Sequence, residues 1–225
     1  MISEEKATAA KICVSVATPD FAERPGVAQS SAMVELRLDL MLPDLEQVKE
    51  LLHHRHHYRL PTIATCREGK LSLPERLQLL QFAIRHGASY VDIEVEADKT
   101  YREALVRLAK ECGCKVIISY HNFEQTPGLP EMRKIIADCR SMSADVVKLV
   151  TTAHTVHDNA RVLSLYEGES NLVAFAMGSI GKITRLACLY LGAPFTYASP
   201  ASGLESAPGQ ITAEDMSIMI QNFDF

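Results

Sequence analysis

Hydrophobic residues along the chain fall into short runs, separated by longer segments in which they recur with helical spacing. Eight short runs, rich in β-branched and other apolar residues, predict buried strands. They cover residues 12–16, 33–38, 62–65, 90–95, 115–119, 145–150, 171–176 and 195–198. Helical spacing predicts helices over residues 43–57, 74–86, 101–111, 130–141, 156–167, 182–191 and 213–222. The first gap, residues 18–32, contains no convincing helix.

The regular alternation of strand and helix predicts a parallel (β/α)8 barrel. The chain has 225 residues, within the range of about 200 to 250 residues that such a barrel needs. An open, doubly wound parallel sheet is the alternative. That fold usually carries a glycine-rich nucleotide-binding turn after its first strand, and none follows residues 12–16. No linker rich in proline or serine divides the chain, so we expect a single domain over residues 1–225.

The composition favours a small molecule as the partner. The chain carries 28 Asp and Glu against 23 Lys and Arg, a net charge of −5, whereas nucleic-acid binding needs excess positive charge. No run approaches the roughly 18 apolar residues of a membrane span, and the acidic first residues do not form a signal peptide. We therefore expect a cytoplasmic protein without nucleic-acid or membrane partners. Its cysteines are expected to be reduced; they are Cys13, Cys66, Cys112, Cys114, Cys139 and Cys188.

Charged side chains occupy several predicted strands or follow them directly. In residues 34–39, acidic and basic residues alternate with apolar ones, which places Glu35, Arg37 and Asp39 on one face of a strand. The active sites of (β/α)8 enzymes lie at the carboxyl ends of the strands. We therefore expect six side chains from five strands to converge on one mouth: Glu35, Arg37, Arg67, Glu94, His121 and Lys148.

Lys148 is the most informative of these residues, because it lies within the apolar run 145–150. Burial of an ammonium group is costly, so the group is either ion-paired or unusually ready to lose its proton. A deprotonated lysine is a nucleophile that forms imines with ketones. Together with His121 to move a proton and arginines to hold a carboxylate, Lys148 predicts Schiff-base chemistry on a keto acid. For any one of these residues, a structural ion pair is the alternative interpretation.

Seven short motifs carry a resemblance that runs from the first predicted strand to the last helix. They are Glu35-Leu-Arg37-Leu-Asp39, Thr65-Cys-Arg67, Tyr90-Val-Asp92-Ile-Glu94, Ser119-Tyr-His121-Asn122-Phe123, Val147-Lys148, Met177-Gly178-Ser-Ile-Gly181-Lys-Ile-Thr-Arg185-Leu and Ser206-Ala-Pro208-Gly209-Gln210. In this order they resemble the type I 3-dehydroquinate dehydratases of the shikimate pathway. The resemblance implies a (β/α)8 barrel that needs neither cofactor nor metal.

The resemblance also implies a role for each matching residue. Lys148 would form an imine with the C3 ketone of 3-dehydroquinate, and His121 would remove a C2 proton and then protonate the departing C1 hydroxyl, giving 3-dehydroshikimate. Arg185 would pair with the substrate carboxylate. The other implied substrate contacts are Ser15, Glu35, Arg37, Arg67, Ser206 and Gln210. Ser206 and Gln210 lie on a segment that resembles the mobile lid of the family.

One segment departs from the family pattern. Relatives place a Glu-Gly-Gly turn, whose glutamate supports the catalytic histidine, several residues after the third-strand arginine. The sequence Arg67-Glu68-Gly69-Lys70 is shorter and lacks the second glycine. Either Glu68 or Glu94 is the candidate to orient His121, and the sequence does not decide between them.

Other functions remain as alternatives. A class I aldolase would share the strand-six lysine, and a non-catalytic barrel that binds a metabolite is the alternative from outside the enzymes. The histidine run at residues 53–57 resembles a metal site, but no cysteine or carboxylate completes a ligand set, so we expect no metal. By family resemblance we expect a homodimer, fused to a shikimate dehydrogenase or working beside one.

Overall fold

A ring of parallel strands forms the centre of the molecule in the computed structural model, which describes residues 11–18, 31–57 and 60–223. The strands are β1 (Ile12–Val16), β2 (Met33–Arg37), β3 (Thr62–Thr65), β4 (Tyr90–Glu94), β5 (Lys115–His121), β6 (Val146–Thr152), β7 (Leu172–Met177) and β8 (Thr196–Ala198). Each strand from β1 to β6 pairs in parallel with the next, and β8 returns to pair in parallel with β1, so that among the described residues the ring lacks pairing only between β7 and β8. This consecutive order with its return to β1 confirms the (β/α)8 barrel and excludes the doubly wound sheet.

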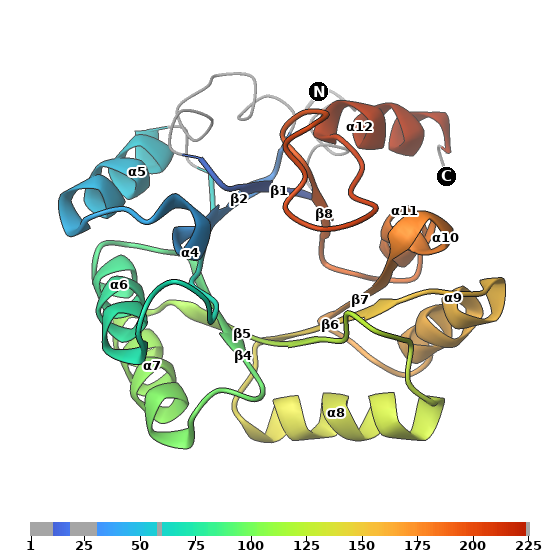
Figure 1. The fold of residues 1–225 in the computed structure, drawn as a ribbon, viewed down its shortest axis with the longest axis horizontal. Helices are drawn as coiled ribbons and strands as arrows, with labels where there is room; N and C mark the ends of the chain where they lie inside the picture. The colour runs from blue at the N-terminus through green and yellow to red at the C-terminus, as the bar shows by residue number, and fades with distance from the viewer. Residues whose placement is uncertain (1–10, 19–30, 58–59, 224–225) are drawn as a thin grey trace.

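Helices surround this ring of strands (Figure 1). They are α4 (Leu38–Met41), α5 (Leu45–His57), α6 (Leu73–Arg85), α7 (Lys99–Cys112), α8 (Leu129–Ser141), α9 (Val156–Leu163), the 3-10 turn η1 (Ser164–Tyr166), α10 (Gly178–Gly181), α11 (Thr184–Tyr190) and α12 (Ala213–Asn222). Several begin at a side-chain cap, because the first amides of a helix need acceptors. Ser72 and Glu75 form a capping box at α6, and the Thr212 hydroxyl accepts from the Asp215 amide at α12. Among the described residues, no helix is long and apolar enough to cross a membrane.

The predicted elements are present with small shifts at their ends. Residues 19–30 of the first gap lie outside the described residues. The second strand ends at Arg37 rather than at residue 38, and the prediction that Asp39 lies on this strand is wrong, because the chain turns into α4 at Leu38. Arg37 and Asp39 still meet, since Arg37 Nε and Nη2 donate to the two Asp39 carboxylate oxygens at 3.0 and 2.6 Å. The helix predicted over residues 182–191 is shorter, and the short helix α10 precedes it.

The buried apolar side chains form two clusters. The larger one fills the space between the strands and the surrounding helices. The smaller one lies inside the barrel and includes Cys13, Ile63, Ile117, Val173 and Phe195. All six cysteines are free thiols, and only Cys112 is exposed. The polar residues described below share the barrel interior with the smaller cluster.

Candidate active site

Lys148 on β6 lies inside the barrel between two carboxylates. Its Nζ is 3.0 Å from Asp92 Oδ2 on β4 and 3.3 Å from Glu35 Oε1 on β2. The Nζ also lies 4.0 Å from the centre of the Tyr197 ring on β8. All four residues are at most 4% exposed. They come from alternate strands, as does each layer of four side chains inside a (β/α)8 barrel, so Lys148 completes a polar layer where such barrels usually carry apolar ones.

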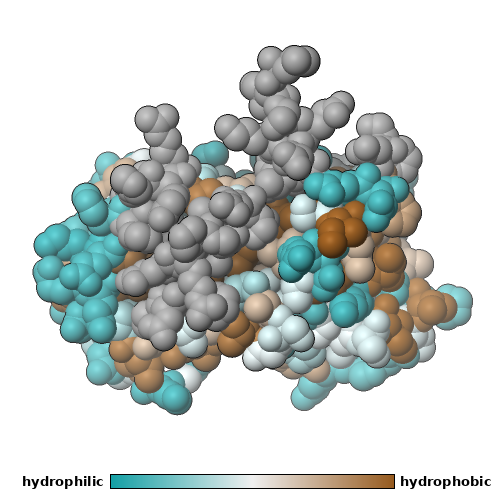
Figure 2. Space-filling model, turned by 90° about the horizontal axis from the view of Figure 1, so that it is seen from above, coloured by the Kyte–Doolittle hydropathy of each residue, from teal (hydrophilic) through white to brown (hydrophobic). Residues whose placement is uncertain are grey.

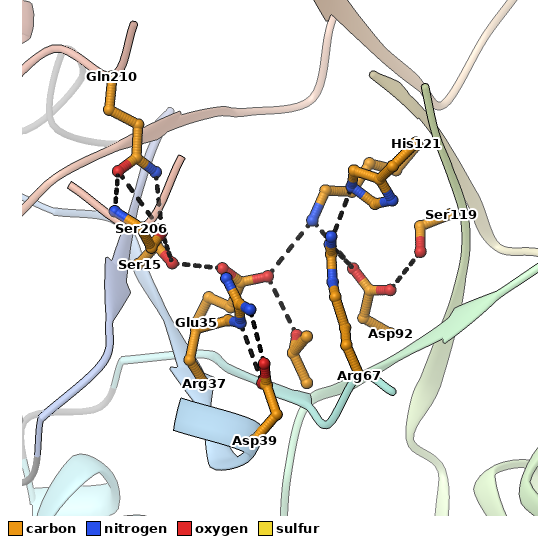
Figure 3. A network of polar contacts seen from close by, with 12 residues as sticks. Ser15, Glu35, Arg37, Asp39, Arg67, Asp92, Ser119, His121, Ser206 and Gln210 are labelled. Carbon is orange, nitrogen blue, oxygen red and sulfur yellow. Dashed lines mark hydrogen bonds and ion pairs between the residues drawn. The ribbon is translucent and has the colours of Figure 1, made fainter. Parts of the chain in front are cut away.

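Hydroxyl groups from three of the remaining strands, β1, β3 and β5, hold the two carboxylates. Ser15 and Thr65 donate to the two Glu35 oxygens at 2.5 and 3.0 Å, and Ser119 donates to Asp92 Oδ1 at 2.5 Å (Figure 3). Burial alone would raise the pKa of Glu35, but the charge of Lys148, then those of Arg37 and Arg67, and the Ser15 hydrogen bond lower it to about 2. Glu35 is therefore ionised at neutral pH and forms a charged pair with Lys148.

His121 is the last residue of β5 and contacts Arg67 at the end of β3. The Arg67 guanidinium lies 2.9 Å from His121 Nε2, whereas the buried His121 Nδ1 has no partner among the described residues (Figure 3). Burial, and then the charges of Arg67, Lys148 and Arg37, lower the pKa of His121 well below 6.5. His121 is therefore neutral at pH 7, as a general base must be.

Neither acid that the sequence suggested as the support of His121 hydrogen-bonds to it in the described part of the chain. Glu68 and Glu94 both line the same cavity as His121. The polar contact that His121 makes is with Arg67, which also lies 4.0 Å from Asp92 Oδ2. Arg67 thus links the histidine to the Asp92 carboxylate beside Lys148.

Arg185 on α11 is a buried cation without a carboxylate partner among the described residues. It is 1% exposed, and its guanidinium lies 4.3 Å from the centre of the Phe175 ring. Its Nη2 donates to the Pro208 carbonyl oxygen at 3.3 Å, and its Nε has no partner. Burial lowers the pKa of Arg185 to about 10, so it remains charged at neutral pH. A desolvated guanidinium beside a cavity is a strong site for a carboxylate.

The segment between β8 and α12 covers part of the mouth of the barrel. Gln210 Oε1 accepts from the Ser206 amide at 2.7 Å, and the Ser206 hydroxyl lies 3.0 Å from that of Ser15 (Figure 3). Gly209 has a φ of +73° and packs against Gly178, where an added Cβ would lie 2.6 Å from the Gly178 carbonyl oxygen. Only glycine fits at this position.

A cavity of about 330 Å³ opens at the carboxyl ends of the strands. Nearly all the predicted site residues line it: Glu35, Arg37, Arg67, Glu68, Glu94, His121, Lys148, Arg185, Ser206 and Gln210. Ser15 is fully buried behind them, with its hydroxyl shared between Glu35 and Ser206. The predicted convergence of six side chains on one mouth is confirmed, since all six line this cavity: Glu35, Arg37, Arg67, Glu94, His121 and Lys148.

Two further residues of the site were not among the sequence candidates. Asp92 contacts Lys148 directly, and Tyr197 both contacts Lys148 and lines the cavity. An aspartate inside an apolar strand could have been recognised from the sequence, whereas a tyrosine in a strand is not distinguishable from an ordinary core residue.

In the described residues, no group of three or more His, Cys, Asp or Glu side chains could hold a metal ion. The side chains of residues 54–57 lie outside the described set.

The fold and the cavity together define a (β/α)8 barrel with a lysine-centred site for an anionic ligand. Residues 12–223 match the sequence model of the Type I 3-dehydroquinase family. The chain belongs to this family.

Individual relatives and solved structures agree with that assignment. A 3-dehydroquinate dehydratase of Pyrococcus abyssi is 37% identical over 198 residues, covering 86% of this chain and 88% of the relative. The crystal structure of the 3-dehydroquinate dehydratase from Aquifex aeolicus superposes with a TM-score of 0.84 at 32% identity, covering 96% of this chain and 99% of the other. A dehydroquinate dehydratase and shikimate dehydrogenase from S. pombe has the same fold over 45% of its own chain and 96% of this one, with a TM-score of 0.77 and 22% identity.

Proposed function

We propose that this protein dehydrates 3-dehydroquinate to 3-dehydroshikimate in the shikimate pathway, through an imine on Lys148. The observation that carries the proposal is the contact of Lys148 with both Asp92 and Glu35 beside a cavity that also holds His121 and Arg185. Family membership supports the reaction, since a lysine Schiff base is characteristic of type I enzymes.

The first chemical step joins Lys148 to the substrate. The neutral amine adds to the C3 carbonyl carbon, and the carbonyl oxygen leaves as water, so that a protonated imine remains. Asp92, with its Oδ2 at 3.0 Å, is the nearest carboxylate to receive the proton that the ammonium must first lose, and it returns this proton to the departing oxygen, which leaves as water. The positive imine nitrogen then lies between two carboxylates, which stabilise its charge.

The elimination follows at the neighbouring carbons. The imine withdraws electrons from C2, and His121 removes a C2 proton, which leaves an enamine. The enamine electrons then expel the C1 hydroxyl, which takes the proton from His121 and departs as water. Hydrolysis of the imine releases 3-dehydroshikimate and restores Lys148. A histidine that is neutral before the reaction fits this role, because its free form can accept the C2 proton.

The remaining charged residues bind the substrate in this proposal. Arg185 pairs with the carboxylate, which supplies the counter-ion that the buried guanidinium lacks among the described side chains. Glu35, Arg37 and Arg67 hold ring hydroxyls, and Ser206 and Gln210 close over the substrate. Direct contact of Ser15 with the substrate stays a prediction, since Glu35 and Ser206 already share its hydroxyl.

A spectrophotometric assay tests the proposed reaction. The product contains a conjugated enone, so ultraviolet absorbance should rise when 3-dehydroquinate is added to the wild-type protein and should not rise with Lys148→Ala. Sugar phosphates should be inert, which separates this activity from that of an aldolase. Tight binding of 3-dehydroquinate without turnover would instead identify a non-catalytic barrel and overturn the proposal.

We infer further that residues 1–225 act as one cytoplasmic dehydratase domain within a homodimer. The family match over residues 12–223 supports a single domain. Exposed apolar side chains on α11 and α12 and at their C-terminal caps support a contact between two copies; they are Tyr190, Leu191, Ile218, Met219 and Phe223. The surface that includes α12 mixes such hydrophobic residues with hydrophilic ones (Figure 2). Light scattering of the wild-type protein and of Phe223→Glu would test the dimer.

The S. pombe structure, which combines a dehydratase with a shikimate dehydrogenase, supports a functional link between the two activities. We propose that this protein likewise works beside a shikimate dehydrogenase, which consumes its product. Coupled assays with a purified shikimate dehydrogenase would test the link. The rate of conversion of 3-dehydroquinate is compared when the two proteins are mixed and when a membrane that passes only small molecules separates them.

A further inference from the structure

Tyr197 is the fourth member of the polar layer, and the mechanism above assigns it no task. Its ring centre lies 4.0 Å from Lys148 Nζ, within the range of a cation–π contact. The side chain is 3% exposed and lines the cavity beside Lys148. We propose that Tyr197 is a positioning residue for the reaction: its ring face, together with Asp92 and Glu35, keeps the Lys148 amine directed at the ketone of the substrate. This proposal rests on the imine role of Lys148.

The ring, rather than the hydroxyl, carries this role. The Tyr197 Oη is buried and has no hydrogen-bond partner among the described residues. Burial, and then the nearby Glu35, Cys13 and Asp92, raise the pKa of Tyr197 well above 10, so the hydroxyl does not act as a base at neutral pH. Removal of an unpartnered buried hydroxyl breaks no hydrogen bond.

Two neighbouring aromatic residues hold the ring in place. Phe195 packs edge-on against Tyr197, with ring centres 5.6 Å apart and an angle of 67°. The Phe175 ring lies 6.2 Å away at 55°. Tyr197 is therefore a fixed wall on the β8 side of Lys148, within the packed barrel interior. Without this wall, the flexible lysine side chain gains space on the β8 side and spends less time in a reactive geometry.

The decisive comparison is between variants that keep the ring and variants that remove it. Tyr197→Phe keeps the ring and should retain kcat to within about twofold, because only the unpartnered hydroxyl is lost. Tyr197→Leu removes the ring and should lower kcat by about 10- to 100-fold while KM changes by less than about threefold, since misplacement of a reacting group by about 1 Å has effects of this size. The rate at which borohydride captures the imine in the presence of 3-dehydroquinate should fall in parallel with kcat.

Phe195→Leu is the matched control for the cavity that Tyr197→Leu creates. It removes a ring from the same aromatic cluster but leaves the ring that contacts Lys148. We expect a similar decrease in melting temperature but a much smaller decrease in kcat than in Tyr197→Leu, because a leucine at this position still packs against the Tyr197 ring. Tyr197→Met is assayed as a second ring-free variant. Its longer side chain fills more of the space that the ring leaves, so it provides the test if Tyr197→Leu does not fold.

The outcomes separate this inference from the proposed function. If the wild-type protein forms the imine but a folded ring-free variant keeps the wild-type kcat, the role of Tyr197 is wrong and that of Lys148 stands. A loss of kcat in Tyr197→Phe equal to that in Tyr197→Leu would also overturn the proposal, because it would assign the role to the hydroxyl. If both ring-free variants unfold while Phe195→Leu folds, the ring serves the fold rather than the lysine, and the proposal is again wrong.

Discussion

Arg67 donates a hydrogen bond to His121 Nε2 across 2.9 Å, which determines how the histidine carries its proton. A guanidinium can only donate, so Nε2 must be the acceptor. The proton of the neutral ring is therefore on Nδ1, which is buried without a partner among the described residues. The sequence suggested Glu68 or Glu94 as the residue that orients His121, whereas in the structure Arg67 contacts it. The positive neighbour keeps His121 uncharged, and Nε2 can accept a substrate proton once Arg67 releases it.

The protonation state of His121 is the first testable consequence. Nitrogen-15 NMR of the wild-type protein should show a neutral ring with the proton on Nδ1 at pH 6, because burial and the nearby cations disfavour the charged form. Replacement of the neighbouring cation in Arg67→Met should move the midpoint of the His121 titration upward. A wild-type ring that is half-protonated at pH 6.5 or above would contradict this account.

The same shift affects stability in acid. The pKa of His121 is lowered in the folded state, so below about pH 6.5 the unfolded chain binds a proton that the folded protein does not. The free energy of unfolding of the wild type should therefore decrease as the pH falls from 6.5 towards the pKa of His121 in the folded protein. The decrease should be smaller in His121→Asn. Urea unfolding curves measured at several pH values provide this comparison, and parallel curves for the two proteins would count against it.

Glu35→Gln tests the buried ion pair with Lys148. The pKa of Glu35 is lowered from 4.5 to about 2, so its stabilising contribution is present above about pH 4.5 and is lost as the pH falls towards 2. A shift of this size corresponds to roughly 3 kcal/mol. The variant should lose about that free energy of unfolding at pH 7 and show a weaker dependence on acid. Glu46→Gln, which alters an exposed pair with Lys49, is the control and should unfold as the wild type does.

Arg185→Met should separate stability from binding. Because Arg185 is buried without a carboxylate partner in the described structure, its replacement by an apolar side chain should stabilise the unliganded protein by about 1 to 3 kcal/mol. The KM for 3-dehydroquinate should rise roughly 100-fold, because the carboxylate loses its charged partner. Thermal unfolding with and without substrate measures both effects. An unchanged KM would remove Arg185 from substrate binding, and the exposed Lys182→Met serves as the control for loss of a charge.

Gly209→Ala tests the contact between the lid segment and Gly178. An added Cβ would lie 2.6 Å from the Gly178 carbonyl oxygen, so the segment must move away from its observed position. We expect kcat/KM to fall by about tenfold, with a small change in melting temperature. Gly203→Ala is the matched control: Gly203 has a similar φ of +82°, and nothing lies within 4 Å of its Cβ position. Equal effects in the two variants would show that backbone strain alone, and not the contact with Gly178, explains the loss.

Much of this architecture could be predicted from the pattern of apolar runs. Strands buried on both faces have a strong signal, and two of them, β1 and β3, begin and end at the predicted residues. The end of β2 was less certain because Leu38 and Asp39 continue the alternation of the strand, whereas the backbone turns there into α4. The short helix α10 begins and ends with glycine, which gives no helical signal.

The candidate site could be predicted to the level of residues but not of contacts. Ionisable residues inside the predicted apolar strands identified Glu35, Arg37 and Lys148, and His121 was identified because it follows such a strand directly, since burial of such groups needs an explanation. The alternation along β4 places Asp92 and Glu94 on the same face of the strand. Only their positions along the barrel relative to Lys148 show that it is Asp92 that contacts the lysine. The contact between Arg67 and His121 depends on the positions of two strand ends in space, which no local pattern encodes.

Two substitutions divide the proposed reaction into its steps. Lys148→Ala should abolish turnover and imine formation together. His121→Ala should retain part of its imine formation, because the amine and its two carboxylates remain, but should not release 3-dehydroshikimate. Rapid-mixing experiments that follow imine capture and product absorbance separately distinguish these cases. A fully active Lys148→Ala protein would overturn the assignment of the nucleophile.

Borohydride capture of the imine, read by mass spectrometry, tests the central claim most directly. When 3-dehydroquinate and borohydride are added together, we expect irreversible inactivation and one covalent adduct located on Lys148. Borohydride without substrate should leave the protein unmodified and active. An enzyme that turns over 3-dehydroquinate while Lys148 stays unmodified by borohydride would contradict the proposed mechanism.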